Sequence, residues 1–203
     1  MKTKKVKGFT LVELIVVIAI IGVLAAILVP SMLGYVKKSK VSSANTSASS
    51  IYKAFNTALT DMDAEGRDMG GKYLVTYTHE NTFTAGTSTF TGVPATATPT
   101  GQTDANIVLA EKVHNYFEDI NKCSIIAAIN GGTCKAVGCA TDTTYVGAFP
   151  AVVTVDNYDQ WTIGNACLQA YNKAMNLTVT IPSGATSNPN DYSAPSTAGI
   201  TLP

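Results

Sequence analysis

Residues 9–29 read FTLVELIVVIAIIGVLAAILV, an apolar run of 21 residues with a single charged side chain, Glu13. A helix needs about 20 apolar residues to cross the hydrocarbon core of a membrane, so this length predicts a transmembrane helix. A cleaved secretory signal has a shorter apolar core, of about 7–15 residues, followed by a small-residue cleavage site. Here Pro30 follows the run and three lysines come soon after it. Length alone leaves a plain single-pass anchor open as an alternative.

Glu13 argues against a plain anchor. A carboxylate near the middle of a bilayer costs on the order of 3 kcal/mol, and somewhat less near an end. The basic segment MKTKKVKG, residues 1–8, precedes the run and ends in Gly8. If the chain is cut after Gly8, the new amine of Phe9 lies one helical turn from Glu13, at positions i and i+4. The spacing therefore predicts that the carboxylate gains a partner only through cleavage, within one chain or between neighbours.

The order of residues at this junction resembles the class III signal of type IV prepilins, of the N-methylphenylalanine type. The residues that carry the resemblance are Lys7-Gly8-Phe9-Thr10-Leu11-Val12-Glu13-Leu14, followed by an unbroken apolar helix. The resemblance implies cleavage between Gly8 and Phe9 by an aspartic prepilin peptidase on the cytoplasmic side, and methylation of the Phe9 amine. It also implies that Glu13 sets the register of assembly by meeting the terminal amine of an adjacent subunit.

Gly22 and Pro30 resemble family positions where the helix loosens inside assembled filaments. Glycine lowers helix propensity and proline removes a backbone donor, so melting between them costs little free energy. The expected result is a loosened segment inside the filament core.

The second half of the long helix is predicted to be amphipathic and to end near Gly66. Apolar residues step by three and four positions along one face, which is typical of a helix lying against a globular head. They are Val41, Ala44, Ala48, Ile51, Phe55, Ala58 and Met62. The expected organisation is a leader at 1–8, a transmembrane or filament-core helix at 9–30, an amphipathic half at 31–65 and a globular head at 66–203.

The head is expected to be an α+β structure of the pilin type, in which the long helix packs on a small antiparallel sheet. The predicted strands are Lys72–Thr78, Tyr145–Val155 and Leu177–Ile181, with Trp161–Ile163 and Gly199–Leu202 as further candidates. A helix is expected from Asp104 through Ile120, and over Asn165–Asn176 a short helix carrying Cys167 is favoured over a strand. Residues 79–103 are expected to form a loop or loose hairpin, and 130–144 a turn-rich loop pinned by a disulfide.

Four cysteines lie in the C-terminal half: Cys123, Cys134, Cys139 and Cys167. An even number in an exported chain predicts two disulfides in an oxidising compartment, with three possible connectivities that the sequence does not resolve. A zinc site is the alternative, but no CxxC pair is present.

Composition argues against several other functions. Outside the first eight residues ten basic residues face fourteen acidic ones, a net charge of about −4, which disfavours a dedicated nucleic-acid site. No nucleotide-binding, hydrolase or metalloprotease motif occurs. His79 and His114 are too few for most metal or acid–base sites, and the carboxylates at Asp61, Asp63, Glu65 and Asp68 lack a calcium-loop spacing. We expect no enzyme activity, no cofactor and no metal.

The expected function is a structural subunit of a type IV pilus, serving adhesion, surface motility or DNA uptake. The alternatives are a pseudopilin of a type II secretion system and a minor pilin or tip adhesin. The resemblance implies identical or related pilin subunits, a prepilin peptidase, an inner-membrane assembly platform and, before assembly, membrane lipid as partners. The precursor is expected to be a single-pass protein of the cytoplasmic membrane, and the mature protein to lie in an extracellular pilus.

Overall fold

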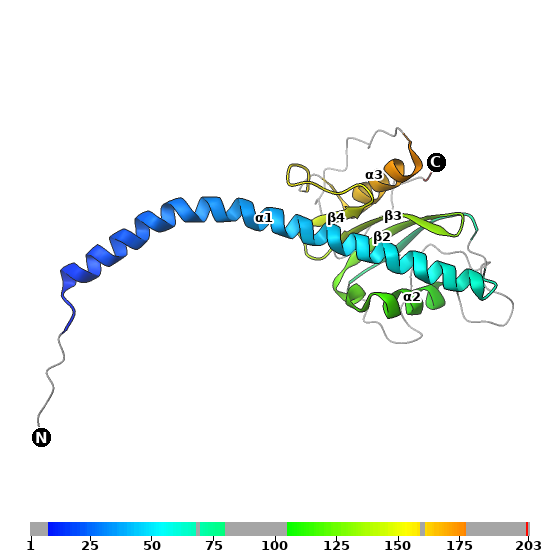
Figure 1. Ribbon diagram of the computed structural model, residues 1–203, viewed down its shortest axis with the longest axis horizontal. Helices are drawn as coiled ribbons and strands as arrows, with labels where there is room; N and C mark the ends of the chain where they lie inside the picture. Colours follow the sequence, from blue (N-terminus) through cyan, green and yellow to red (C-terminus); the bar gives the residue numbers. More distant parts are fainter. Residues whose placement is uncertain (1–7, 68–69, 80–104, 159–160, 178–201, 203) are drawn as a thin grey trace, which may run out of the picture. The chain divides into compact units, whose positions relative to one another are not determined.

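The computed structural model describes residues 8–67, 70–79, 105–158, 161–177 and 202. The chain forms two compact units, Met1–Ser39 and Lys40–Pro203. Its elements (Figure 1) are the helices α1 (Leu11–Ala64), α2 (Ala105–Tyr116) and α3 (Ile163–Met175), the 3-10 helix η2 (Glu118–Lys122), and the strands β1 (Lys72–Tyr77), β2 (Ser124–Asn130), β3 (Thr133–Ala140) and β4 (Val146–Phe149).

The first unit holds the apolar part of α1. Its large apolar side chains between Leu11 and Val36 are each at least 45 % exposed. By length and composition α1 can cross a membrane. The helix predicted for this part of the chain is confirmed. Its exposed apolar surface needs lipid or protein to cover it, because a patch of this size is unfavourable in water.

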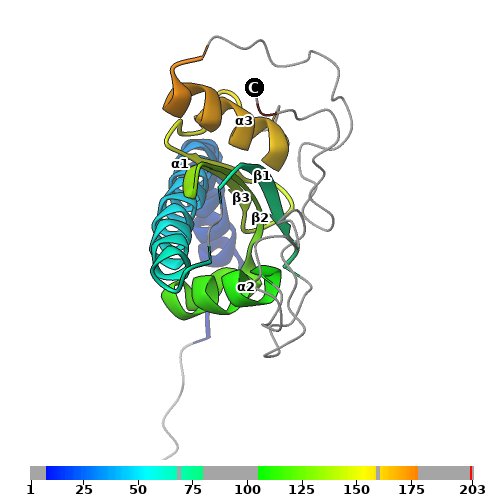
Figure 2. The ribbon, with the colours of Figure 1, turned by 90° about the vertical axis from the view of Figure 1, so that its right-hand side faces the viewer.

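The second unit is built on a four-stranded antiparallel sheet with the order β1-β2-β3-β4. Figure 2 shows α3 over one face of the sheet, with α2 and the end of α1 over the other. One buried cluster joins α1 and α2 to residues such as Val75, Ile125 and Val137. A second cluster joins α3 to residues such as Ile126 and Ala136. The predicted α+β head is therefore confirmed, with helices on both faces of the sheet.

The β2–β3 hairpin forms the centre of the sheet and was not predicted. The first six residues of β2 are buried, since helices cover both faces, so the strand lacks the alternation that marks a half-exposed strand. Gly131 and Gly132 have φ angles of 61° and 70°, as the two-residue type I′ turn requires. The prediction of a turn-rich loop over 130–144 is wrong for 133–140, which form β3, and is confirmed for the turn at Gly131-Gly132 and for 141–144, which connect β3 to β4.

Three other predictions need correction. Strand β4 ends at Phe149, since Pro150 follows and has no backbone donor for a ladder. Trp161–Ile163 is not a strand, because the Thr162 hydroxyl accepts from the Asn165 backbone N–H at 3.1 Å and caps α3. The second helix stops at Tyr116, and Ile120 lies in η2 instead.

The remaining head predictions have mixed outcomes. Strand β1 and the helix carrying Cys167 are confirmed. The predictions for 80–103, Asp104, 178–181 and 199–201 lie outside the described residues.

The end of α1 follows the prediction at Gly66. This glycine has a φ of 74°, which favours a residue without a side chain. Its N–H donates to the Asp63 carbonyl, and the Arg67 N–H donates to the Met62 carbonyl, both at 2.9 Å. These two bonds form a Schellman motif, which satisfies carbonyls that the helix end leaves free.

Two asparagines attach the end of α1 to the sheet. The Asn45 amide accepts from the N–H groups of Ala148 and Val153, each at 3.0 Å, and donates to the Val153 carbonyl at 2.8 Å. Asn56 accepts from the Cys134 N–H at 3.1 Å and donates to its carbonyl at 3.3 Å. The two amides thus satisfy backbone groups of β3, of β4 and of the segment after β4, so α1 docks through hydrogen bonds as well as apolar contacts.

Candidate functional site

The N-terminal junction places Gly8, Phe9 and Thr10 immediately before α1. Phe9 is 81 % exposed. The Thr10 backbone N–H donates to Glu13 Oε2 at 2.8 Å, and the Glu13 N–H donates to the Thr10 hydroxyl at 3.3 Å. These reciprocal bonds form a capping box, in which the first residue before a helix and the third residue inside it satisfy each other's backbone donors.

This geometry corrects the prediction that Glu13 gains a partner only through cleavage. In the uncut chain its carboxylate already accepts two hydrogen bonds from Thr10, the second from the hydroxyl at 2.7 Å. The helix N-terminus also carries partial positive charge, which favours an acidic side chain there. Sequence reasoning missed Thr10, although Thr10-x-x-Glu13 ahead of an apolar run is a known helix-start signal.

The capped carboxylate remains suited to bind an amine. Both bonds from Thr10 go to Oε2, and Oε1 receives none from the described residues. A cut after Gly8 would create an ammonium group on the residue beside Thr10. Glu13 can then serve as an anionic acceptor for its own amine or for that of a neighbouring chain.

Gly22 and Pro30 lie within α1, which continues through both residues. The helix has no backbone N–H at Pro30, and nearby the Ser31 hydroxyl donates to the Leu28 carbonyl at 2.9 Å. A Cβ at Gly22 would meet no atom within 4 Å. Loosening at these positions inside a filament stays a prediction.

All four cysteines are buried thiols in the second unit. Burial raises the pKa of Cys123 to about 11 and that of Cys167 to about 12. It also raises the pKa values of Cys134 and Cys139 well above the ordinary range. The structure does not show the two predicted disulfides, so they stay a prediction.

The acidic group at the end of α1 contacts α2. Glu65 accepts from Lys112 Nζ at 2.6 Å, and the Tyr116 hydroxyl donates to Asp61. Within the described part of the chain no three His, Cys, Asp or Glu side chains gather as a metal site would require. Asp68 lies outside that part. These carboxylates therefore hold the second helix against the first.

The two histidines lie apart. The His79 backbone N–H donates to the Ser124 hydroxyl at 3.1 Å, and its ring Nδ1 lies 3.2 Å from the same oxygen. Ser124 is fully buried, so no substrate reaches this oxygen. His114 lies on α2, half-buried.

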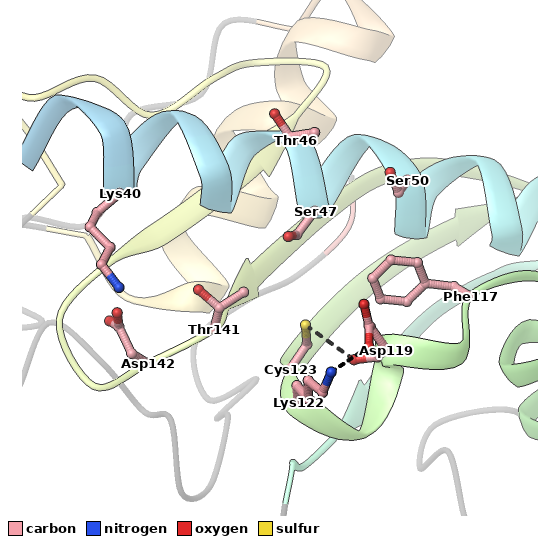
Figure 3. A pocket seen from close by; sticks show the side chains of 10 residues that line it. All are labelled: Lys40, Thr46, Ser47, Ser50, Phe117, Asp119, Lys122, Cys123, Thr141 and Asp142. Atoms are coloured by element: carbon pink, nitrogen blue, oxygen red, sulfur yellow. Dashed lines mark hydrogen bonds and ion pairs between the residues drawn. The ribbon is translucent and has the colours of Figure 1, made fainter. Parts of the chain in front are cut away.

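A pocket of about 380 Å³ opens beside α1 between Lys40 and Ser50, lined largely by polar residues (Figure 3). Lys122 pairs with Asp119 at 2.7 Å, while Lys40 and Asp142 point toward each other across it. The Cys123 thiol also lines the pocket. Because its charges balance and its one ion pair is mostly exposed, the pocket has no strong preference for either sign of ligand charge.

Comparison with known proteins links the N-terminal junction to filament proteins. Residues 3–29 match the family model described as the prokaryotic N-terminal methylation motif. The chain is 37 % identical over 105 residues to the type IV major fimbrial protein FimA of Dichelobacter nodosus, covering 50 % of this chain and 60 % of that protein.

Shorter matches join it to two further filament proteins. The type IV major pilin protein PilA of Myxococcus xanthus is 42 % identical over 57 residues, covering 28 % of this chain and 26 % of that protein. A fimbrial protein of Pseudomonas aeruginosa is 41 % identical over 58 residues, covering 29 % and 38 %. The chain thus matches less than two thirds of each relative's length. No solved structure gave a significant match.

Proposed function

We propose that this chain is the precursor of a type IV pilus subunit, cut between Gly8 and Phe9 and assembled through its apolar helix. The observation that carries the proposal is the methylation motif over residues 3–29, joined to a helix whose start is organised around Thr10 and Glu13. The relatives are named as fimbrial proteins and pilins, which favours a pilus over a secretion pseudopilus.

In the proposed pathway the apolar part of α1 first lies in the cytoplasmic membrane. A prepilin peptidase removes residues 1–8, and the Phe9 amine is methylated. An inner-membrane assembly platform then transfers the helix from lipid to the filament, where neighbouring helices cover its exposed apolar surface. The pilus lies outside the cell and serves adhesion, surface motility or DNA uptake.

Glu13 has two roles in this proposal. Before cleavage it caps α1 through Thr10. After cleavage its charge pairs with the Phe9 amine of a neighbouring subunit and sets the register. An unpaired charge inside an apolar assembly costs about 3–5 kcal/mol, so the pair discriminates strongly against wrong registers.

Substituting Glu13→Gln tests the second role separately from the first. Glutamine also forms capping boxes, so its side-chain oxygen can still accept from the Thr10 N–H, but the negative charge is lost. We expect membrane insertion and cleavage to continue. The yield of sheared surface filaments should fall more than about tenfold, because losing more than about 1.4 kcal/mol of assembly free energy lowers the assembly constant by at least that factor.

Thr10→Ala is the matched control. It removes the capping hydroxyl at a cost of about 1 kcal/mol but keeps the carboxylate, so filaments should form at near wild-type yield. Equal losses of filament yield in the two variants would show that Glu13 acts only as a capping residue. Normal filament yield in Glu13→Gln would contradict the assembly role.

A further inference from the structure

The register of the sheet decides which cysteines can be joined. A disulfide needs Cα atoms about 4.4–6.8 Å apart, and four cysteines offer six possible pairs. Since β2 and β3 are paired residue by residue, the distance between most cysteines follows from their positions along these strands.

Two pairs are excluded by distance along the strands. Cys134 lies opposite Ile129 and Cys139 opposite Ile125, four residues of β2 apart, which at about 3.3 Å per residue separates their backbones by roughly 13 Å. Cys134 pairs with Ile129, and Cys123 is six residues before Ile129, roughly 20 Å along β2. Neither pair can bond without dismantling the hairpin.

The three pairs that involve Cys167 are excluded by the sheet itself. Cys167 packs in the cluster under α3, whereas Cys123, Cys134 and Cys139 pack in the cluster under α1 and α2. The backbone of the sheet therefore separates Cys167 from the other three thiols.

Cys134 comes nearest to an exception. Its Sγ lies 3.5 Å from the Ala136 carbonyl oxygen, and Cys167 Sγ lies 3.9 Å from the same oxygen. However, the Cβ of Cys167 lies over Gly138, where an added Cβ would be 3.1 Å away. Gly138 lies opposite Ile126 and Cys134 opposite Ile129, three residues of β2 apart, which separates the two by roughly 10 Å along the sheet. The two thiols lie near the same carbonyl oxygen, but their backbones are too far apart for a disulfide.

The remaining pair is Cys123 and Cys139. Cys139 lies directly opposite Ile125, and Cys123 is two residues before Ile125, so the two cysteines are diagonal neighbours on one face. Diagonal neighbours are about 7–8 Å apart, slightly more than a disulfide requires. Cys123 lies one residue before β2 and outside its ladder, and its N–H donates to the Ile120 carbonyl at 3.0 Å at the end of η2. The shift that closes the gap therefore moves Cys123 together with the end of η2 and leaves the paired strands in place.

We propose that the mature head carries one disulfide, between Cys123 and Cys139, and keeps Cys134 and Cys167 as buried thiols. The inference rests on the proposed function, because an exported head meets an oxidising compartment. It replaces the two disulfides expected from the even number of cysteines.

The bond would form by exchange with a disulfide-bonded oxidant. The Cys123 thiol loses its proton and attacks one sulfur of the oxidant, whose other sulfur leaves as a thiolate. The Cys139 thiol then loses its proton and displaces the first sulfur, so the two cysteines are oxidised and the oxidant becomes a dithiol. Both thiols are buried, but of the two only Cys123 lines the pocket in Figure 3, so it is the entry point for the oxidant.

Thiol counting on full-length mature protein, purified from the cell surface of the native host, tests the proposal. The protein is denatured without reductant and labelled with a maleimide. We expect two labels, on Cys134 and Cys167, and a linked pair containing Cys123 and Cys139. Trypsin leaves Cys123 and Cys134 on one peptide, because it cuts after Lys122 and Lys135, so fragment spectra must assign the link.

Two single variants check the assignment through the number of maleimide labels. Cys134→Ser should carry one label, because the disulfide persists, and Cys139→Ser should carry three, because Cys123 is released. Four labels, no label or a different linked pair in the wild-type protein would overturn the proposal, whether or not the variants fold. The N-terminus of the same sample separates the two claims: cleavage at Phe9 with four free thiols overturns this inference alone.

Discussion

At the scale of single residues, two glycines set how closely the helices approach the sheet. A Cβ added at Gly147 would lie 2.1 Å from the Ala44 carbonyl carbon and 2.4 Å from the Asn45 nitrogen. A Cβ added at Gly138 would lie 2.3 Å from the Ile163 carbonyl oxygen. Both conflicts are with helix backbone, which cannot move aside as a flexible side chain can.

Gly147→Ala should therefore destabilise the head. Forcing α1 away from β4 strains a closely packed contact, and overpacking of this kind costs about 1–3 kcal/mol. Denaturant unfolding of the full chain in detergent, followed by the fluorescence of Trp161, measures the midpoint. Gly34→Ala is the control, since an added Cβ there meets nothing within 4 Å and leaves the midpoint unchanged or higher. Equal midpoints for Gly147→Ala and the wild type would show that α1 does not lie this close to β4.

The residues proposed to act at the junction were predictable to different degrees. Gly8, Phe9 and Glu13 follow from a cleavage motif and from the cost of a charge in an apolar run, both of which are local in sequence. Thr10 escapes this reasoning, because the amine that cleavage creates on Phe9 already accounts for the charge of Glu13 in an apolar run. Cysteine pairing needs the register of two strands, which the sequence does not reveal.

At the scale of elements, the helices were easier to predict than the central strands. The apolar residues in the second half of α1 repeat at helical spacing, and seven predicted core positions from Val41 to Met62 are buried. Strand β2 has no such period, because its residues contact helices on both faces. The signal that was available is Asn130-Gly131-Gly132 between two apolar runs, which is typical of a tight hairpin.

Asn45 should contribute strongly to the docking of α1 onto the sheet. Asn45→Ala leaves the N–H groups of Ala148 and Val153 without their acceptor and the Val153 carbonyl without its donor. Each of these three unsatisfied groups costs about 1–3 kcal/mol, so we expect a loss of about 3 kcal/mol or more in the free energy of unfolding.

Asn45→Asp is the matched variant. It keeps the acceptor for both N–H groups but places a carboxylate oxygen against the Val153 carbonyl, so its loss should be intermediate at neutral pH. The same unfolding measurement ranks the three proteins. A loss below 0.5 kcal/mol for Asn45→Ala, roughly the smallest net value of one hydrogen bond, would contradict a docking role.

At the scale of the whole molecule, the two units have opposite surface character. The unit ending at Ser39 exposes its apolar side chains, whereas the unit beginning at Lys40 buries its apolar residues in two clusters on either side of a sheet. In the proposed pathway, lipid and then neighbouring helices cover these exposed apolar side chains, while the head keeps its own buried clusters.

The N-terminal mass of the subunit isolated from sheared surface filaments tests the central claim most directly. The account predicts a chain that begins at Phe9 and carries one extra methyl group on its amine. The Glu13→Gln chain recovered from the membrane should also begin at Phe9. A filament-free cell surface, an intact Met1, or a chain that begins beyond Pro30 would contradict it.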